Sequence, residues 1–372
     1  MHGPHRLTGR RAQLTALRDG ERRGREVVLV ARPDGELRPG DFRVVEVPVR
    51  EPDPGEVLVR NTWTSVDPGL RLRLAERGPA GYFAPFALGA PMDGIMTVGE
   101  IVDSRADGFA AGDTVWHAAG WREYAVVAAG APALGGLGRL TRLDTRLAPA
   151  QRYLGPLGGM GLTAYAGLFD VAGLREGDVV WVSAAAGAVG SLAAQLAKLR
   201  GHRVIGSAGS DEKVAYLRDD LGLDAVFNHR AGPVADLLRD AAPDGIDVYF
   251  DCVGGDHLEA ALGSLRRGGR VALCGAVSQY GRAPRGPANL FQATANDLTL
   301  RGFRGRSHLD RMDEMQRSVA GWLRDGRLRY RETIVDGLER APEALARMLA
   351  GDTIGKTLVR VTEAPANVNC GH

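Results

Sequence analysis

The chain has 372 residues, of which 44% are hydrophobic, 25% charged and 6% aromatic, which is the range of folded globular proteins. Its length predicts two domains rather than one hydrophobic core. The 47 basic and 45 acidic side chains leave a net charge of +2, which argues against nucleic-acid and acidic membrane partners. The sequence contains no long apolar run and no apolar stretch at its start, so we expect a cytoplasmic protein that acts on a small molecule.

The cysteines and histidines give no sign of a metal site. Cys252, Cys274 and Cys370 lie far apart in the sequence and form no CxxC pair, and the eight histidines show no HxxxH spacing. We therefore expect no metal ion.

The first part of the chain divides into an extension and a domain of short strands. Residues 1–25 are rich in arginine and poor in apolar residues, which predicts a disordered extension, with a basic nucleic-acid arm as the alternative. From 26 to 147, short apolar segments separated by Gly and Pro predict an antiparallel barrel or sandwich. The predicted strands are 27–31, 42–49, 56–62, 98–103 and 114–117.

The second part, residues 148–305, alternates apolar strands with helices and predicts a parallel, doubly wound sheet. The strands are expected at 178–183, 203–208, 225–227, 247–251, 269–274 and from about 298. The helices are expected at 190–200, 211–221, 234–241 and 256–265. Residues 306–364 should return to the first domain through helices 312–325 and 341–350 and a strand at 356–361, and 365–372 form a tail.

A dinucleotide-binding turn follows the first of these parallel strands. The turn 184–190 consists of small residues and ends in Gly187, Ala188, Val189 and Gly190, after which a helix begins. Small residues let the backbone approach a pyrophosphate, and the first N–H groups of the helix point at its charge. Ala185 stands where the GxGxxG pattern has its first glycine, so the order strand, turn, helix is the stronger signal.

The end of the second parallel strand favours NADPH over NADH. NAD sites place a carboxylate there, whereas this chain has small neutral residues up to Gly209. Ser210 can cap the next helix and donate to a phosphate, and Lys213 can reach the same anion. His229, just after the third strand, can close the other side of the phosphate.

Several strings resemble the medium-chain dehydrogenase/reductase superfamily, and within it the zinc-independent branch of prostaglandin, alkenal double-bond and curcumin reductases. They are Leu-Thr-Ala-Tyr at 162–165, the turn 184–190, Gly-Ser-Asp-Glu-Lys-Val at 209–214, Phe-Asp-Cys-Val-Gly-Gly at 250–255 and Cys-Gly-Ala-Val-Ser-Gln-Tyr at 274–280. The resemblance implies a Rossmann domain inserted into a GroES-like β-barrel catalytic domain, and a homodimer. It also implies NADPH-dependent reduction of the C=C bond of α,β-unsaturated aldehydes or ketones.

The resemblance also implies roles for individual residues. Tyr280 follows the fifth parallel strand, where sheet carboxyl ends meet the cofactor, and matches a tyrosine assigned a proton-donor or orienting role. Cys252, Cys274, Phe303 and Thr353 match segments that contact the cofactor. Zinc-dependent members have a metal-binding Cys near 65–67 and Gly-His-Glu near 94–99, and this chain has neither.

Four departures from the branch bear on the pocket. Gly69 stands where members commonly have a tyrosine, which removes an aromatic wall from the expected pocket. His229 replaces a tyrosine at the 2′-phosphate, Thr353 replaces an asparagine, and the charged triplet 304–306 replaces apolar residues. Two alternatives therefore stay open. One is a quinone reductase of the same superfamily, and the other is a catalytically idle NADPH-binding sensor or a module that binds nucleic acid or another partner.

Overall fold

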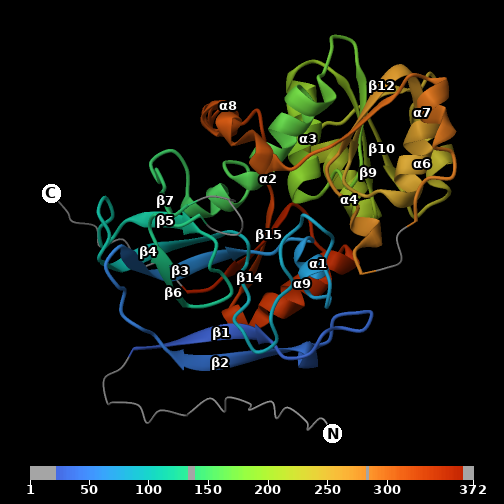
Figure 1. Ribbon diagram of the computed structural model, residues 1–372. Helices are drawn as coiled ribbons and strands as arrows, with labels where there is room; N and C mark the ends of the chain where they lie inside the picture. Colours follow the sequence, from blue (N-terminus) through green and yellow to red (C-terminus); the bar gives the residue numbers. More distant parts are fainter. Residues whose placement is uncertain (1–21, 133–138, 282–284, 363–372) are drawn as a thin grey trace, which may run out of the picture.

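The computed structural model describes residues 22–132, 139–281 and 285–362, which form two lobes (Figure 1). In that view the blue and cyan strands build the lower lobe, and the yellow-green and orange segments build the upper lobe. The last, red segment returns to the lower lobe. No helix in this part of the chain is long and apolar enough to cross a membrane.

The lower lobe is built on a seven-stranded sheet in the order β14-β15-β3-β4-β5-β7, with β6 paired to β3. Residues 56–60 of β3 pair with β6 and residues 63–65 pair with β15, so two strands share one edge of β3. Val57, Val59, Ile101 and Val115 are fully buried together on one face. The strands are β3 (Glu56–Ser65), β4 (Thr97–Ser104), β5 (Thr114–His117), β6 (Tyr124–Ala128), β7 (Thr141–Arg142), β14 (Glu332–Asp336) and β15 (Lys356–Arg360).

A two-stranded ribbon begins earlier than we expected. Strand β1 (Arg23–Leu29) pairs antiparallel with β2 (Phe42–Pro48), so the expectation of disorder is wrong for residues 23–25. The arginines there are paired: Arg23 contacts Glu46 at 2.5 Å and Arg25 contacts Glu123 at 2.7 Å. These glutamates are distant in sequence, so local composition could not reveal the pairing. Residues 1–21 of the predicted extension lie outside the described residues.

The upper lobe contains a six-stranded, wholly parallel sheet in the order β10-β9-β8-β11-β12-β13. Chain order reverses between β8 and β11, which is where doubly wound sheets bind ligands. The predicted strands are all present, with ends shifted by four residues at most. They are β8 (Val179–Val182), β9 (Arg203–Ala208), β10 (Ala225–Asn228), β11 (Ile246–Asp251), β12 (Leu265–Leu273) and β13 (Thr299–Gly302).

Helices cover both faces of this sheet, which explains its nearly continuous apolar strands. Alternate residues of β8 point to opposite sides: Val180 and Val182 lie in one core cluster and Trp181 in the other. The first cluster includes residues of α2 (Gly159–Ala166) and α3 (Ala188–Leu199), and the second includes α5 (Val234–Ala241) and α6 (Gly255–Ser264). The predicted helix 211–221 is α4 (Asp211–Ala215) followed by a wider π-helical turn, Tyr216–Asp220, whose first two residues are buried.

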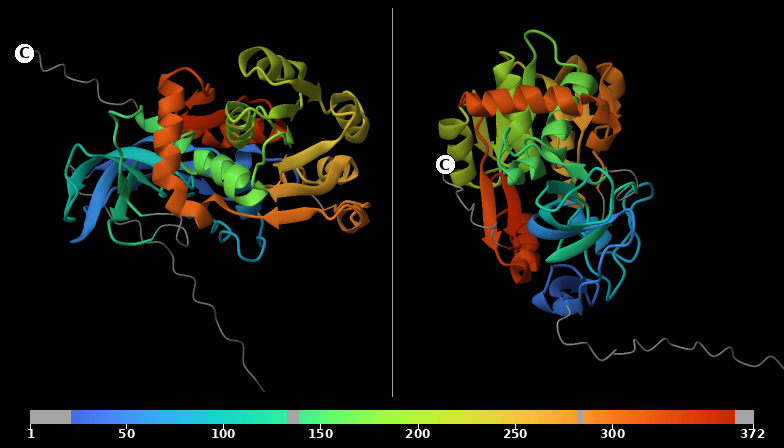
Figure 2. Two further views of the ribbon diagram at one scale, coloured as in Figure 1. Left: turned by 90° about the horizontal axis from the view of Figure 1, so that it is seen from above. Right: turned by 90° about the vertical axis from the view of Figure 1, so that its left-hand side faces the viewer.

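The segment after β13 is divided between the lobes. Helix α8 (Met312–Arg324) buries Met315, Val319 and Ala320 in the same cluster as α2 and α3, and Figure 2 shows it beside the upper lobe. Strands β14 and β15 join the lower sheet, and α9 (Ala341–Ala350) packs in the lower core. The boundaries predicted at 147/148 and 305/306 stay predictions. The remaining helices are α1 (Leu70–Arg73) and α7 (Phe291–Ala295).

Candidate cofactor and substrate site

The turn between β8 and α3 leaves its backbone exposed to a ligand. A Cβ on Gly190 would overlap the carbonyl oxygen of Ala184 and lie 2.9 Å from its carbonyl carbon, so only glycine fits there. Gly187 caps α3 without any side-chain hydrogen bond. The first N–H groups of α3, at Ala188, Val189 and Gly190, are therefore left for an anion, as a pyrophosphate requires. The structure places the four predicted residues of this turn together.

The returning segment of the lower lobe rests against this turn. The N–H of Gly355 donates to the carbonyl of Ala186 at 2.7 Å, and Gly355 forms a parallel bridge with Gly187. Gly355 has a φ of +72°, and a Cβ there would overlap the carbonyl oxygen of Arg331. Thr353 lies two residues earlier, between α9 and β15, so its position adjoins the turn. A contact between Thr353 and a cofactor stays a prediction.

The residues predicted to bind a 2′-phosphate gather around Gly209. A Cβ on Gly209 would lie 3.0 Å from Nε2 of His229 and 3.5 Å from Nε of Arg230. Ser210 is the N-cap of α4, and its Oγ accepts a hydrogen bond of 3.3 Å from the N–H of Lys213. The bare backbone at Gly209 thus faces the imidazole of His229 and the guanidinium of Arg230, and Ser210 follows it directly.

The two cations reach across to the lower lobe. Lys213 Nζ donates to the carbonyl of Gly351 at 2.6 Å, and Arg230 donates to that of Ala350 at 3.4 Å. Burial, followed by the Arg230 guanidinium, lowers the pKa values of both Lys213 and His229. Like charges crowded together in this way favour an anion between them. The cluster therefore fits a phosphate group better than it fits a neutral ribose hydroxyl.

Two thiols meet at the carboxyl ends of β11 and β12. The N–H of Cys274 donates to the carbonyl of Asp251 at 2.9 Å, and the N–H of Cys252 donates to Oγ of Ser183 at 2.9 Å. A hydrogen bond between the two thiols, together with burial, raises the pKa of Cys252 well above its usual range. Both cysteines lie at the predicted cofactor edge, and their contact with a cofactor stays a prediction.

Tyr280 follows β12 and a short 3-10 turn, Val277–Gln279. Its phenol oxygen accepts a long hydrogen bond, 3.4 Å, from the N–H of Ala276. Burial raises the pKa of Tyr280, so the phenol is protonated at neutral pH and its O–H can act as a hydrogen-bond donor. The predicted catalytic residue thus stands at the same sheet edge as the two thiols and the phosphate-binding turn.

Phe303 has a structural place in the core cluster that includes α2 and α3. Its ring meets that of Phe250 edge to face, with centroids 6.2 Å apart. A Cβ on Gly167 would overlap both rings, at 2.5 Å from each. Its N–H donates to the carbonyl of Leu273 at 3.4 Å. Phe303 lies at the carboxyl end of β13, and its predicted cofactor contact remains a prediction.

Sequence reasoning missed a buried ion pair in the lower lobe. Lys356 Nζ donates to Oδ1 of Asp67 at 2.7 Å and to the carbonyl of Val66 at 2.9 Å, and the lysine is 1% exposed. Ser65 also donates to Asp67 through its hydroxyl. These residues occupy the segment where zinc-dependent relatives were expected to have a cysteine ligand. Asp67 and Lys356 lie almost 300 positions apart in the sequence, so no local pattern could indicate that they pair.

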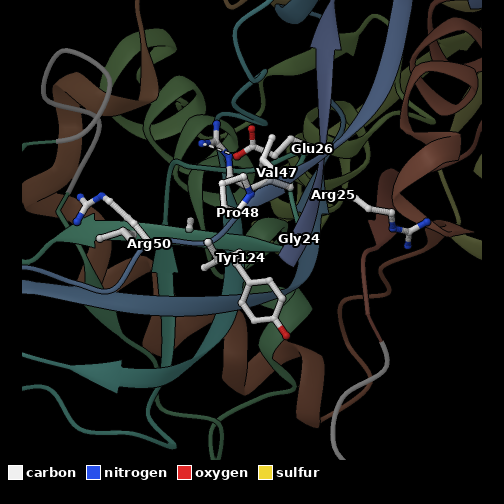
Figure 3. A pocket seen from close by; sticks show the side chains of 11 residues that line it. Gly24, Arg25, Glu26, Val47, Pro48, Arg50 and Tyr124 are labelled. Carbon is white, nitrogen blue, oxygen red and sulfur yellow. Dashed lines mark ion pairs between the residues drawn. The ribbon is translucent and has the colours of Figure 1, made fainter. Parts of the chain in front are cut away.

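One pocket of about 210 Å³ opens away from this edge, between β1, β2 and β6 (Figure 3). Arg25 and Arg50 lie at its wall, but both already have carboxylate partners, Glu123 and Glu56. No lining residue belongs to the parallel sheet, so we do not assign the pocket to the cofactor or substrate.

Comparison with known proteins supplies the family. Residues 25–133 match the model of the N-terminal domain of oxidoreductase, and residues 188–321 match that of zinc-binding dehydrogenase. The putative NADP-dependent oxidoreductase YfmJ of Bacillus subtilis is 39% identical, over 83% of this chain and 89% of that protein. The NADP(+)-dependent 2-alkenal reductase of Nicotiana tabacum is 36% identical, over 82% and 88%. The crystal structure of CurA in complex with NADPH from Vibrio vulnificus has a TM-score of 0.84 at 34% identity, over 91% and 100%.

The fold, the glycine turn before α3 and these matches define an oxidoreductase: the chain belongs to the medium-chain dehydrogenase/reductase superfamily. Within the superfamily it groups with the branch that includes prostaglandin, alkenal and curcumin reductases. The predicted family and the predicted combination of a Rossmann domain with a GroES-like catalytic domain are confirmed. Among the described residues, no group of three or more His, Cys, Asp or Glu is placed to hold a metal ion. Independence from metal stays a prediction.

Proposed function

We propose that this NADPH-dependent oxidoreductase reduces the carbon–carbon double bond of α,β-unsaturated aldehydes and ketones, without zinc. The observation that carries the proposal is the position of Tyr280, a protonated phenol at the sheet edge where the phosphate-binding turn ends. The similarity to a 2-alkenal reductase, a pulegone reductase and a curcumin reductase supports this class of substrate.

The chain's own residues bind the cofactor and complete the reaction. The backbone of 187–190 and the N-terminus of α3 hold the pyrophosphate, while Ser210, Lys213 and His229 hold the 2′-phosphate. Bound NADPH supplies two electrons, as a hydride, for addition to the β-carbon. Tyr280 then gives its phenol proton to the α-carbon and regains a proton from solvent, so one proton is consumed in each turnover.

NADPH oxidation measured against a panel of enals, enones, quinones and simple ketones tests the proposal. We expect turnover of enals and enones, and product analysis should find a saturated aldehyde or ketone rather than an allylic alcohol. Reduction of quinones alone would replace this function with the quinone reductase alternative. NADPH binding without turnover of any acceptor would favour the idle binding protein.

A homodimer and a cytoplasmic location belong to the same proposal and rest on the family resemblance. Sedimentation velocity of the purified protein tests the first, and a mass equal to one chain at micromolar concentration would contradict it. Fractionation of the source cells tests the second.

A further inference from the structure

The space above Gly69 is taken by the side chain of Tyr82. Gly69 caps α1 with φ −61° and ψ −19°, a conformation that any residue can adopt. A Cβ at this position would overlap the phenol oxygen of Tyr82, although it would lie at an ordinary 3.4 Å from Cζ of the same ring. The absence of a side chain at Gly69 therefore makes room for one group in particular, the Tyr82 hydroxyl.

Arginines of the upper lobe hold the loop that carries Tyr82. Arg304 donates to the carbonyl of Gly81 at 2.6 Å, and the Arg306 guanidinium lies 5.4 Å from the centre of the Phe83 ring. That ring meets the Tyr82 ring edge to face at 4.8 Å. The charged triplet 304–306, which departs from the resemblance, thus has a structural role: it fixes the loop of the lower lobe against the upper one.

The Tyr82 hydroxyl lies close to the segment that carries Tyr280. It adjoins the Cβ position of Gly69, and a Cβ on Gly281 would lie 2.6 Å from Nε of Arg71, two residues after Gly69. Burial raises the pKa of Tyr82 to about 12, and the nearby Tyr280 phenol and Asp67 carboxylate act in the same direction. A phenol in this state keeps its proton at neutral pH. No hydrogen bond of this hydroxyl to another described residue is present, so its donor is available to a ligand.

We propose that the Tyr82 hydroxyl donates a hydrogen bond to the carbonyl oxygen of the substrate, while Tyr280 protonates its α-carbon. This inference rests on the proposed function. As the β-carbon gains a hydride, the π electrons move onto the carbonyl oxygen, and the resulting enolate needs a donor at that oxygen. Collapse of the enolate forms the bond between the α-carbon and the Tyr280 proton, which gives the saturated carbonyl compound and NADP⁺. The two phenols thus act on different atoms of one substrate.

A double-mutant cycle between positions 69 and 82 tests this geometry. Tyr82→Phe should lower kcat/KM for an enone by about 100-fold, the effect of removing one oxyanion donor. Gly69→Ala should cause a loss of similar size, because its methyl group displaces the hydroxyl. In the Tyr82→Phe background, Gly69→Ala should cost less than about threefold, because the ring has then lost the overlapping atom. Losses that simply multiply would overturn the inference.

Two further measurements separate recognition from folding. Calorimetry should show that Tyr82→Phe weakens binding of a saturated ketone to the NADP⁺ complex, with NADP⁺ affinity unchanged. Arg304→Ala should reproduce part of the kinetic loss, whereas Arg301→Ala should not, because the Arg301 side chain donates to the carbonyl of Asp170 within the upper lobe. If the wild type reduces enones and Tyr82→Phe is equally active, only this inference fails. If the wild type reduces no enone, the proposed function fails with it.

Discussion

The two sides of the proposed active site are built from different materials. On the cofactor side, the proposed pyrophosphate contacts come from the backbone, and Gly190 cannot gain even a methyl group without overlap with Ala184. On the substrate side, the proposed reacting groups are the hydroxyls of Tyr82 and Tyr280. Tyr82 packs edge to face against the Phe83 ring, and Tyr280 accepts from the N–H of Ala276. A backbone site cannot accept an added side chain, but it binds a pyrophosphate in any dinucleotide. A side-chain site can be altered by removing a single atom, such as a hydroxyl oxygen.

The largest effect should come from Tyr280. Tyr280→Phe should lower kcat for an enone about ten- to a thousandfold, the range for removing a proton-transfer group or a donor, and leave NADPH binding nearly unchanged. The measurement should use deuterated NADPH and conditions in which hydride transfer limits the rate. An unchanged kcat there would remove Tyr280 from the mechanism and leave the ribose hydroxyl or water as the proton source.

The next effect concerns cofactor choice. Lys213→Ala should raise the Michaelis constant for NADPH about ten- to a hundredfold and that for NADH much less, because only NADPH has a 2′-phosphate for the ammonium to contact. Lys198→Ala is the matched control, since Lys198 is paired with Asp224 at 2.7 Å on the surface of the same lobe. Equal losses with both cofactors would show that Lys213 does not read the phosphate.

A smaller and less selective effect is expected at the turn. Gly190→Ala should weaken NADPH and NADH alike, by roughly tenfold, because an added methyl strains the backbone that both pyrophosphates contact. Gly232→Ala, where an added Cβ would meet nothing within 4 Å, is the control. Preferential loss of one cofactor would contradict a pyrophosphate role. Fluorescence titration of each variant measures both affinities.

No effect at all is expected from chelation. If hydroxyl donors perform the substrate-side chemistry, activity should survive exhaustive dialysis against a chelator. Stoichiometric zinc in the active enzyme, with activity lost on its removal and restored on its return, would contradict this expectation.

Periodicity and spacing predicted most of the architecture. The parallel strands and the turn at 187–190 are visible because each is a local pattern with a local cause, namely burial on two faces or close backbone approach. Pattern reasoning failed where the cause is a distant partner. Strand β1 begins at Arg23 because its backbone pairs with β2, where Arg23 lies opposite Pro48, whereas its arginines alone suggest disorder.

The candidate site shows the same limit. Ser210 and Lys213 were found because they follow a strand end, yet their neighbour at Gly351 was not predictable. The sequence predicts that Gly69 removes an aromatic wall from the pocket, whereas the structure places the hydroxyl of another tyrosine, Tyr82, at the Cβ position of Gly69. Gly69 and Tyr82 are thus neighbours in the fold, although no sequence pattern connects the two positions.

The hydrogen bonds from Lys213 and Arg230 to the C-terminal end of α9 have a consequence for protein engineering. In the free protein both cations face the carbonyl oxygens of Ala350 and Gly351, the negative end of a helix that belongs to the other lobe. In the proposed site, the charges that would select the adenosine phosphate are therefore the same charges that contact α9 of the other lobe. A carboxylate at position 213, the residue type with which NAD sites hold a ribose, would face those carbonyls and repel them. Converting this enzyme to NADH would thus require a new means of holding α9 in place.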